Sequence, residues 1–378
     1  MSVRMCGLVM AVVSAGCALS EGTGGGNEGS GGEGDPQEAT VTSATTGDCD
    51  AFMCGTNSPQ IAEFGFWDLN LPTTFGTAGA TNNVGLQLVF FVQGSAFYLP
   101  RVVGGRLFAI DPGGGPTLSG AGLVGGWLYL RNGSRQFQIR ITEVAQVETW
   151  ARRTDGVHVM LESYRLDWSE FLNGAWGRFR NTCKNPPSRE NPDLLTMATN
   201  NNNFRTLLFE GDRIDAAGKR DTGIETSWFN LGCAGSALAK MALTGHTEAA
   251  RVTRAFDTTL AERQTILKMF AADYCGTGQP FTIGGQPLDW RDDRGTLKLP
   301  AGPPPLVREA RWTPSGAACL DKPRLDAHWT QAGFDAFGSD VYDQVMAVCP
   351  QLPACADTTL DTDGYHLLTA TPPLAPPP

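Results

Sequence analysis

The 378-residue chain lacks a long apolar run, a cluster of positive charge and any Cys-x-x-Cys pair. It has 29 Lys and Arg and 39 Asp and Glu residues, so the net charge is −10. Nucleic acid and anionic lipid require clustered Lys and Arg, and we expect neither as a partner. The excess of acidic residues is best explained by solubility, and recognition through an acidic surface is the alternative.

Signatures of common catalytic and metal sites are also missing. The sequence has no Gly-x-Ser-x-Gly elbow and no His-Glu-x-x-His helix. Histidine occurs only singly, at His158, His246, His328 and His366. Without the ligand spacing of zinc sites, we predict no metal and no cofactor.

The apolar run nearest the N-terminus covers only residues 5–13, which is too short to span a bilayer. With Arg4 before it, this run is typical of a secretory signal. Small residues then precede Cys17, which resembles the lipobox of bacterial lipoproteins, although Ser14 departs from the usual Leu, Val or Ala. The resemblance implies removal of residues 1–16 and lipidation of Cys17. A cleaved signal that releases a soluble protein is the alternative.

Residues 17–48 follow as a lipidated cysteine and a Gly-rich stretch without aromatic residues. Such a segment cannot bury enough apolar surface to fold, and we predict a disordered tether with a reach of roughly 30 Å. Two or three acyl chains would give stable membrane anchoring. Ala18, where an Asp would imply retention, implies sorting to the outer membrane, on its periplasmic or cell-surface face.

The cysteines beyond Cys6 and Cys17 number eight, an even count that in an exported protein predicts up to four disulfides. They are Cys49, Cys54, Cys183, Cys233, Cys275, Cys319, Cys349 and Cys355. Spacing cannot fix their connectivity, but proximity favours Cys49 with Cys54 and Cys349 with Cys355.

Short apolar or alternating segments between turn residues predict a β-rich domain over residues 49–180, as a sandwich or open barrel. The candidate strands are 86–92, 96–103, 106–110, 127–131, 136–144 and 157–166. Asn132 and Gly133 predict a type I′ hairpin. The aromatics Trp127, Tyr129 and Trp150 are interpreted as core residues, with a sugar-binding platform as the alternative.

Helical patterns begin after Phe229. Residues 233–243 are rich in Ala and Leu, and a second helix is predicted to open at Thr259 with a Thr-x-x-Glu capping box. In an antiparallel pair of these helices, Cys233 would lie opposite Cys275, which favours a disulfide between them. The overall prediction is an α+β chain, with a disulfide-pinned module over residues 181–345 and a C-terminal tail over 346–378.

Several short motifs occur in an order that identifies a family. The stretch Ala272, Asp273, Tyr274, Cys275 lies within residues 269–278, preceded by residues 229–240 and followed by 285–289 and 309–319. Together they resemble the ADYC domain of predicted bacterial lipoproteins, over roughly residues 85–330. Relatives usually carry two more cysteines, at positions where this chain has Met241 and Ile266, which implies an apolar contact in place of a bridge. We further hypothesise a Cys183–Cys319 pair. The resemblance implies no activity.

Other acidic residues are interpreted structurally. The Asp273 carboxylate is expected to accept backbone N–H bonds near the helix end, and Asp289, Asp292 and Asp293 to lie in a surface turn. Asp361 and Asp363 match only the start of a calcium loop, because its later ligands are missing. Cys275 as a nucleophile is the alternative to its disulfide.

We therefore expect an envelope or cell-surface lipoprotein that acts as a non-catalytic structural or binding module for an unknown protein or glycan ligand. The alternative is an exported hydrolase of glycan or peptide with carboxylates such as Asp273 or Asp289. Enzymatic activity is left open, with its absence favoured.

Overall fold

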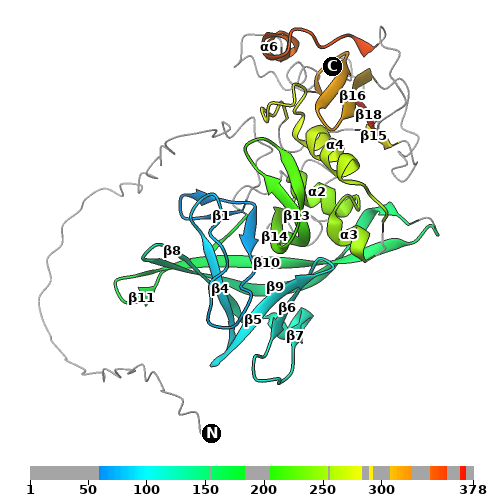
Figure 1. The fold of residues 1–378 in the computed structure, drawn as a ribbon. Helices are drawn as coiled ribbons and strands as arrows, with labels where there is room; N and C mark the ends of the chain where they lie inside the picture. The colour runs from blue at the N-terminus through cyan, green and yellow to red at the C-terminus, as the bar shows by residue number, and fades with distance from the viewer. Residues whose placement is uncertain are drawn as a thin grey trace, which may run out of the picture. The chain divides into compact units, whose positions relative to one another are not determined.

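The computed structural model describes residues 59–153, 155–183, 205–253, 256–282, 289–292, 307–324, 341–355 and 367–371. These residues are mostly β-sheet with few helices (Figure 1). The predicted β-rich chain with a short helical pair is confirmed at this level. The predicted signal, the tether, Cys17, Cys49 and Cys54 lie outside the described residues.

The largest element is a twelve-stranded sheet in the order β3-β14-β13-β10-β9-β8-β4-β5-β6-β7, with β11 and β12 attached to β10. Its strands are β3 (Asp68–Asn70), β4 (Gln87–Gln93), β5 (Ala96–Val103), β6 (Arg106–Ile110), β7 (Leu118–Ser119), β8 (Trp127–Asn132), β9 (Arg135–Arg152), β10 (His158–Leu172), β11 (Ala175–Trp176), β12 (Arg180–Asn181), β13 (Arg205–Asp215) and β14 (Arg220–Cys233). A separate pair joins β1 (Gln60–Ile61) to β2 (Phe64–Gly65). The six candidate strands correspond to β4, β5, β6, β8, β9 and β10. Since β13 and β14 belong to the same sheet, the predicted boundary at residue 180 falls inside it.

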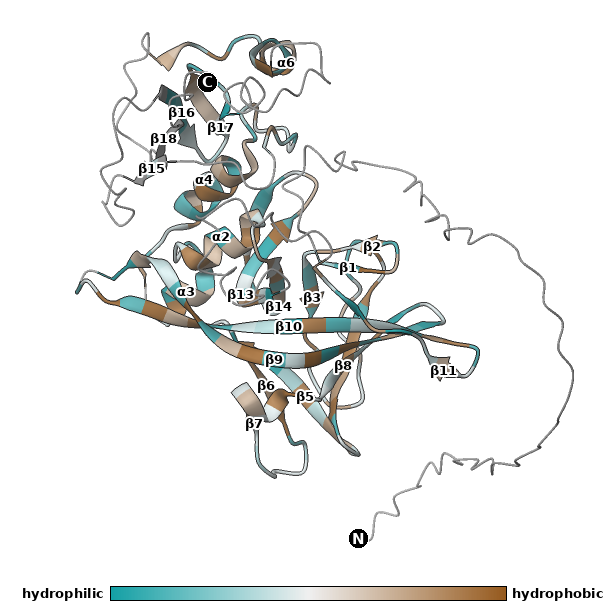
Figure 2. Ribbon diagram, turned by 180° about the vertical axis from the view of Figure 1, so that it is seen from behind, coloured by the Kyte–Doolittle hydropathy of each residue, from teal (hydrophilic) through white to brown (hydrophobic). Residues whose placement is uncertain are grey.

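The sheet surrounds its own apolar core. Bands of apolar and polar residues alternate along β9 and β10 (Figure 2), and Phe137, Ile139 and Ile141 of β9 are fully buried, as their alternation predicted. Leu69 of β3 and Leu107 of β6 lie in this same core cluster, although their strands are far apart in the sheet order. The sheet therefore coils around one core rather than splitting into two facing sheets.

The hairpin between β8 and β9 differs from the predicted type I′ turn. Asn132 pairs with Arg135, so the two turn residues are Gly133 and Ser134. Gly133 has a φ of 56°, while Asn132 remains in the extended strand. A glycine at the first central position followed by a residue of negative φ is the type II′ arrangement, which suits the twist of the strands equally well.

The helices cover a second core cluster. They are α2 (Ala237–Leu243), α3 (Glu248–Val252), α4 (Leu260–Ala271) and α6 (Val341–Val348). The 3-10 helix η1 (Gly120–Leu123) instead contributes Leu123 to the first core cluster. The α4 helix begins with the predicted capping box, in which Thr259 and Glu262 bond each other's backbone N–H groups. Met241 of α2 and Ile266 of α4 are both fully buried in the cluster, as expected for an apolar substitute for a bridge.

A four-stranded sheet contacts this second core. Its order is β15 (Asp289–Asp292), β18 (Leu367–Thr371), β16 (Val307–Thr313) and β17 (Gly316–Leu320). The Nε1 of Trp312 donates a hydrogen bond to Thr369 Oγ1 at 2.9 Å. The segment predicted as a C-terminal tail thus contributes an inner strand, while the final prolines lie outside the described residues.

Six cysteines form three disulfides: Cys183–Cys233, Cys275–Cys349 and Cys319–Cys355. The expected Cys233–Cys275, Cys183–Cys319 and Cys349–Cys355 pairs are therefore wrong. The helix-pair argument fails because α2 starts only at Ala237, so Cys233 still belongs to strand β14. Cys275 lies beyond the end of α4 as well. Neither cysteine is on the helix that the argument assumed.

Removal of the longest of these bridges should cost the most stability. Cys275 and Cys349 are 74 residues apart, whereas Cys319 and Cys355 are 36 apart. Cross-links that close longer loops restrict the unfolded chain more, so replacing both Cys275 and Cys349 by Ala should lower the free energy of unfolding by about 2–5 kcal/mol. Urea titration would measure this, and the matched Cys319→Ala/Cys355→Ala variant should lose less. Peptide mapping that joined Cys233 to Cys275 would contradict the pairing itself.

Candidate functional site

Two groups of buried charged residues lie along α4. The first, which we call the Arg263 cluster, consists of Arg263, Asp212, Asp221 and Glu248, near the start of the helix. The second, the 268–278 junction, covers the end of α4 and contains residues 272–275. Both join α4 to the β13–β14 hairpin.

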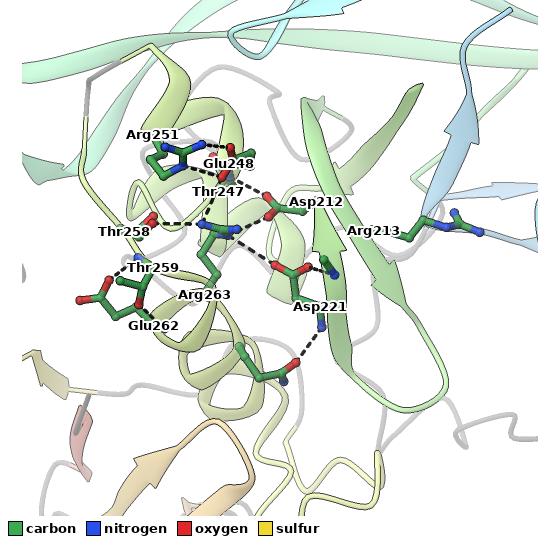
Figure 3. A network of polar contacts seen from close by, with 12 residues as sticks. Asp212, Arg213, Asp221, Thr247, Glu248, Arg251, Thr258, Thr259, Glu262 and Arg263 are labelled. Carbon is green, nitrogen blue, oxygen red and sulfur yellow. Dashed lines mark hydrogen bonds and ion pairs between the residues drawn. The ribbon is translucent and has the colours of Figure 1, made fainter. Parts of the chain in front are cut away.

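In the Arg263 cluster, three carboxylates from three elements converge on one guanidinium (Figure 3). The Nε of Arg263 lies 2.7 Å from Asp212 Oδ1 of β13 and 3.4 Å from Asp221 Oδ2 of β14. Its Nη1 lies 3.3 Å from Glu248 Oε2 of α3. All four side chains are buried, at 3% exposure or less. Charges removed from water this completely persist only when they are paired.

Backbone hydrogen bonds fix the carboxylates in place. Asp212 Oδ2 accepts the N–H of Glu248 at 2.7 Å, and Asp221 Oδ1 accepts the N–H of Gly223 at 3.1 Å. Gly211, at φ 96°, lets the strand approach α3, because a Cβ there would lie 2.6 Å from the Cγ of Glu248. The cluster therefore ties the hairpin to both helices.

The cluster has more acid than base. Its three carboxylates face Arg263 and the half-exposed Arg251, which bonds Glu248. Burial, and then the charge of Asp221, raises the pKa of Asp212 well above its usual range. Burial also raises the pKa of Asp221. If the pair retained one proton, two negative groups would remain against the two positive groups, and the charge of the cluster would be balanced.

At the 268–278 junction, α4 ends in a left-handed residue and a buried ion pair. Ala272 has a φ of 51° and caps the helix. Lys268 Nζ binds the Asp273 carboxylate and also donates to Gly218 O at 2.8 Å, in the β13–β14 turn. Asp273 Oδ2 accepts the N–H of Gly278 at 2.8 Å. The backbone bond that the sequence predicted for Asp273 is present, and the ion pair is an addition to it.

Tyr274 faces the opposite direction, into the four-stranded sheet. Its ring stacks on Trp312 with centroids 5.2 Å apart, and its hydroxyl donates to Glu309 Oε1. Arg324 donates to both oxygens of that carboxylate, at 2.6 and 3.1 Å. Burial, followed by the Glu309 charge, raises the pKa of Tyr274 well above its usual value. The tyrosine is therefore a neutral hydrogen-bond donor within the core.

The last residue of the motif, Cys275, is bonded to Cys349 just after α6. Its sulfur is thus part of a disulfide, and the alternative of a nucleophilic thiol is wrong for this structure. Each of the four residues 272–275 has a different structural contact: a helix cap, a buried ion pair, a tyrosine–carboxylate bond and a disulfide.

The side chains of the other acidic candidates cannot be placed in a site. Asp289 and Asp292 belong to strand β15 rather than a surface turn, and their side chains are outside the described residues, as are Asp293, Asp361 and Asp363. In the described ranges, no three His, Cys, Asp or Glu residues gather as metal ligands. No helix in that part of the chain is long and apolar enough to cross a membrane.

The three candidate aromatics separate into two environments. Trp150 packs against the second core cluster, with its ring 5.9 Å from that of Trp290, which confirms the core interpretation. Trp127 and Tyr129 belong to neither core cluster. They alternate with the buried Leu128 and therefore lie on the outer face of the sheet, so the core interpretation is wrong for these two residues.

Sequence reasoning missed the Arg263 cluster, as well as the Glu309–Arg324 pair. One signal for Arg263 was present. It lies three and four residues before Ile266 and Leu267, on the apolar face of α4, where a charged residue must be paired if it is buried. The identity of its partners had no comparable signal, because they come from distant strands.

The raised pKa of Asp212 should give the protein a characteristic pH dependence. Since folding raises the pKa of Asp212 above the unfolded value of about 3.9, the free energy of unfolding should fall as the pH rises above about 4. An Asp212→Asn variant lacks this titration. Urea titrations between about pH 4.5 and about pH 7.5 should show a shallower decline for it, by up to about 1.4 kcal/mol per pH unit.

Asp215→Asn is the matched control for that measurement. Although burial opposes it, hydrogen bonds from the N–H groups of Gly218 and Ala217 and from Arg220 lower the pKa of Asp215. Its titration is complete below the pH range used, so this variant should keep the wild-type slope. Equal slopes for wild type and Asp212→Asn would contradict the raised pKa of Asp212.

The Lys268–Asp273 pair should respond strongly to the loss of one partner. Asp273→Ala leaves a fully buried ammonium group unpaired, which should cost about 3–5 kcal/mol of unfolding free energy. The double variant Lys268→Met/Asp273→Leu removes both charges and should recover most of that loss. Thermal and urea unfolding would compare them, and a double variant as unstable as the single one would argue against the ion pair.

Comparison with known proteins agrees with the motif at residues 272–275. The family model of the ADYC domain matches residues 120–326, more than half of the chain. The match extends from η1 to just beyond Arg324, so it includes both clusters on α4. No curated protein and no solved structure matches the chain. The chain belongs to the ADYC domain family.

Proposed function

We propose that this protein is an envelope lipoprotein, anchored to the outer membrane through Cys17, whose folded body is a non-catalytic binding or structural module. The observation that carries the proposal is the set of three disulfides among the described cysteines. Disulfides of this number persist in oxidising compartments outside the cytosol. The signal-like residues 1–16 and the Gly-rich tether supply a route to that compartment and a flexible link to the membrane.

The geometry of the acidic residues supports a module rather than a catalyst. A general acid or base must reach a substrate, and it usually lies in an accessible cleft. Asp273 is instead fully buried against Lys268 and the N–H of Gly278. Burial raises the pKa of both Asp212 and Asp221, as in catalytic carboxylate pairs, yet both side chains have 0% exposure beside Arg263. These carboxylates stabilise the contact of α4 with the hairpin.

The anchor is tested by fractionation and mass spectrometry of the native protein. We expect acyl groups on Cys17 and no free thiol among the six bridged cysteines. A Cys17→Ser variant should move from the membrane to the soluble fraction. A matched Cys6→Ser variant changes a cysteine within the predicted signal and should remain anchored. Native protein with free thiols and no acyl groups would refute the proposal.

A further inference from the structure

Six aromatic rings form a continuous line on the outer face of the large sheet, outside both core clusters. Consecutive ring centroids lie 4.8–6.2 Å apart. We call this line the outer aromatic row. In order it contains Phe97 of β5, Phe90 of β4, Tyr129 and Trp127 of β8, Trp176 of β11 and Phe171 of β10.

Strand register places these rings outward. Leu128 and Leu130 point into the core, so Trp127 and Tyr129 face away from it. Phe97 remains 49% exposed and Phe171 37% exposed at the two ends. The strands β8 and β11 lie toward the same end of the long β9–β10 ribbon in Figures 1 and 2.

A line of partly exposed rings is unusual for a face that stays in water, because large aromatic side chains gain most from burial. Contiguous apolar patches of this kind mark binding surfaces. From β5 to β10 the row crosses four strand spacings, or roughly 19 Å. That length suits an extended ligand rather than a single small molecule.

Polar groups beside the row indicate the chemistry of the ligand. Arg131 continues the outward positions of β8, and its Nε donates to Gln87 at 2.8 Å. Arg140 is the register partner of Trp127, and its guanidinium lies 5.8 Å from the ring of Phe179. Within the described residues, neither arginine has an ion pair with a carboxylate.

Two kinds of contact are therefore available along one line. The negative face of an aromatic ring attracts the polarised C–H groups of a sugar ring. A guanidinium offers a fork of N–H donors that matches a carboxylate. Asp167 of β10 is the register partner of Arg140, but its carboxylate accepts hydrogen bonds from Asn181 and Thr142 and forms no ion pair with that arginine. In a chain of net charge −10, the two guanidiniums therefore remain available to an anion. The combination fits a linear acidic glycan better than a neutral one.

We propose that the outer aromatic row, with Arg131 and Arg140, binds an extended polysaccharide that carries carboxylate groups. The inference rests on the proposed function, since it gives the binding module a ligand class. Rings from five strands stack against successive sugar units, and the arginines bind carboxylates at the border of the row.

The test uses the full mature protein in native gels that contain polygalacturonate, alginate or neutral amylose. We expect migration to be retarded by at least one of the two acidic polysaccharides and only weakly by amylose. Rising salt should weaken the retardation, because the guanidinium contacts are exposed to solvent.

Two double variants separate the contributions. Trp127→Ala/Tyr129→Ala should weaken binding at least tenfold, and Arg131→Gln/Arg140→Gln should weaken it several-fold while removing the salt dependence. Phe75→Ala is the matched control, since Phe75 is a 46% exposed aromatic residue outside the row. All variants should keep the wild-type near-UV circular dichroism, and Trp127→Phe should retain binding if the fold is sensitive to alanine.

Specific outcomes would overturn the inference. They are no retardation by either acidic polysaccharide, equal retardation by amylose, or unchanged binding in the aromatic double variant. Concentration-dependent dimerisation that Trp127→Ala abolishes would assign the face to a second copy of the chain. Failure here leaves the anchored module intact if Cys17 is acylated and the disulfides are formed, so the two proposals fail separately.

Discussion

The buried ion pair between Lys268 and Asp273 holds the end of α4 against the β13–β14 hairpin, and the neighbouring contacts depend on it. With that helix end fixed, Tyr274 is directed to Glu309 in one sheet and Cys275 to Cys349 next to α6. Two charges at this depth lose most of their hydration. The pair is tolerated because each charged group also has a backbone partner: Lys268 Nζ donates to Gly218 O, and Asp273 accepts the N–H of Gly278. The family signature thus describes a structural junction.

The protein buries two clusters of charged side chains and leaves a row of aromatic rings partly exposed. Burying the Arg263 cluster gives little net stability, because the desolvation of three carboxylates offsets their attraction to the guanidinium. A row of exposed rings on the sheet also forgoes burial. The disulfides compensate in part by restricting the unfolded chain.

Local patterns predicted the local elements. Alternation in β9 identified its buried face, and the Thr259–Glu262 box located the start of α4, because each depends on neighbours in sequence. Connectivity failed where it needed long-range information: the disulfide of Cys233 depends on β14 continuing through that residue. Trp127 and Trp150 are the same residue type, and the sequence around them does not distinguish them. Only the strand register showed that Trp127 faces outward, whereas Trp150 packs against the core. The partners of Arg263 come from β13, β14 and α3, which no periodicity could bring together.

The disulfide arrangement also determines how the folded body responds to mechanical force. A pull applied at the N-terminal end of the described residues would be transmitted along the covalent chain, and each disulfide would carry that force directly between its two cysteines. The Cys183–Cys233 and Cys275–Cys349 bonds enclose separate segments with separations of 50 and 74 residues. At about 3.4 Å per residue, those segments withhold roughly 400 Å of extension from a stretched molecule. Even when its sheets are separated, an oxidised body of this kind remains short, because residues 183–233 and 275–349 stay in closed loops.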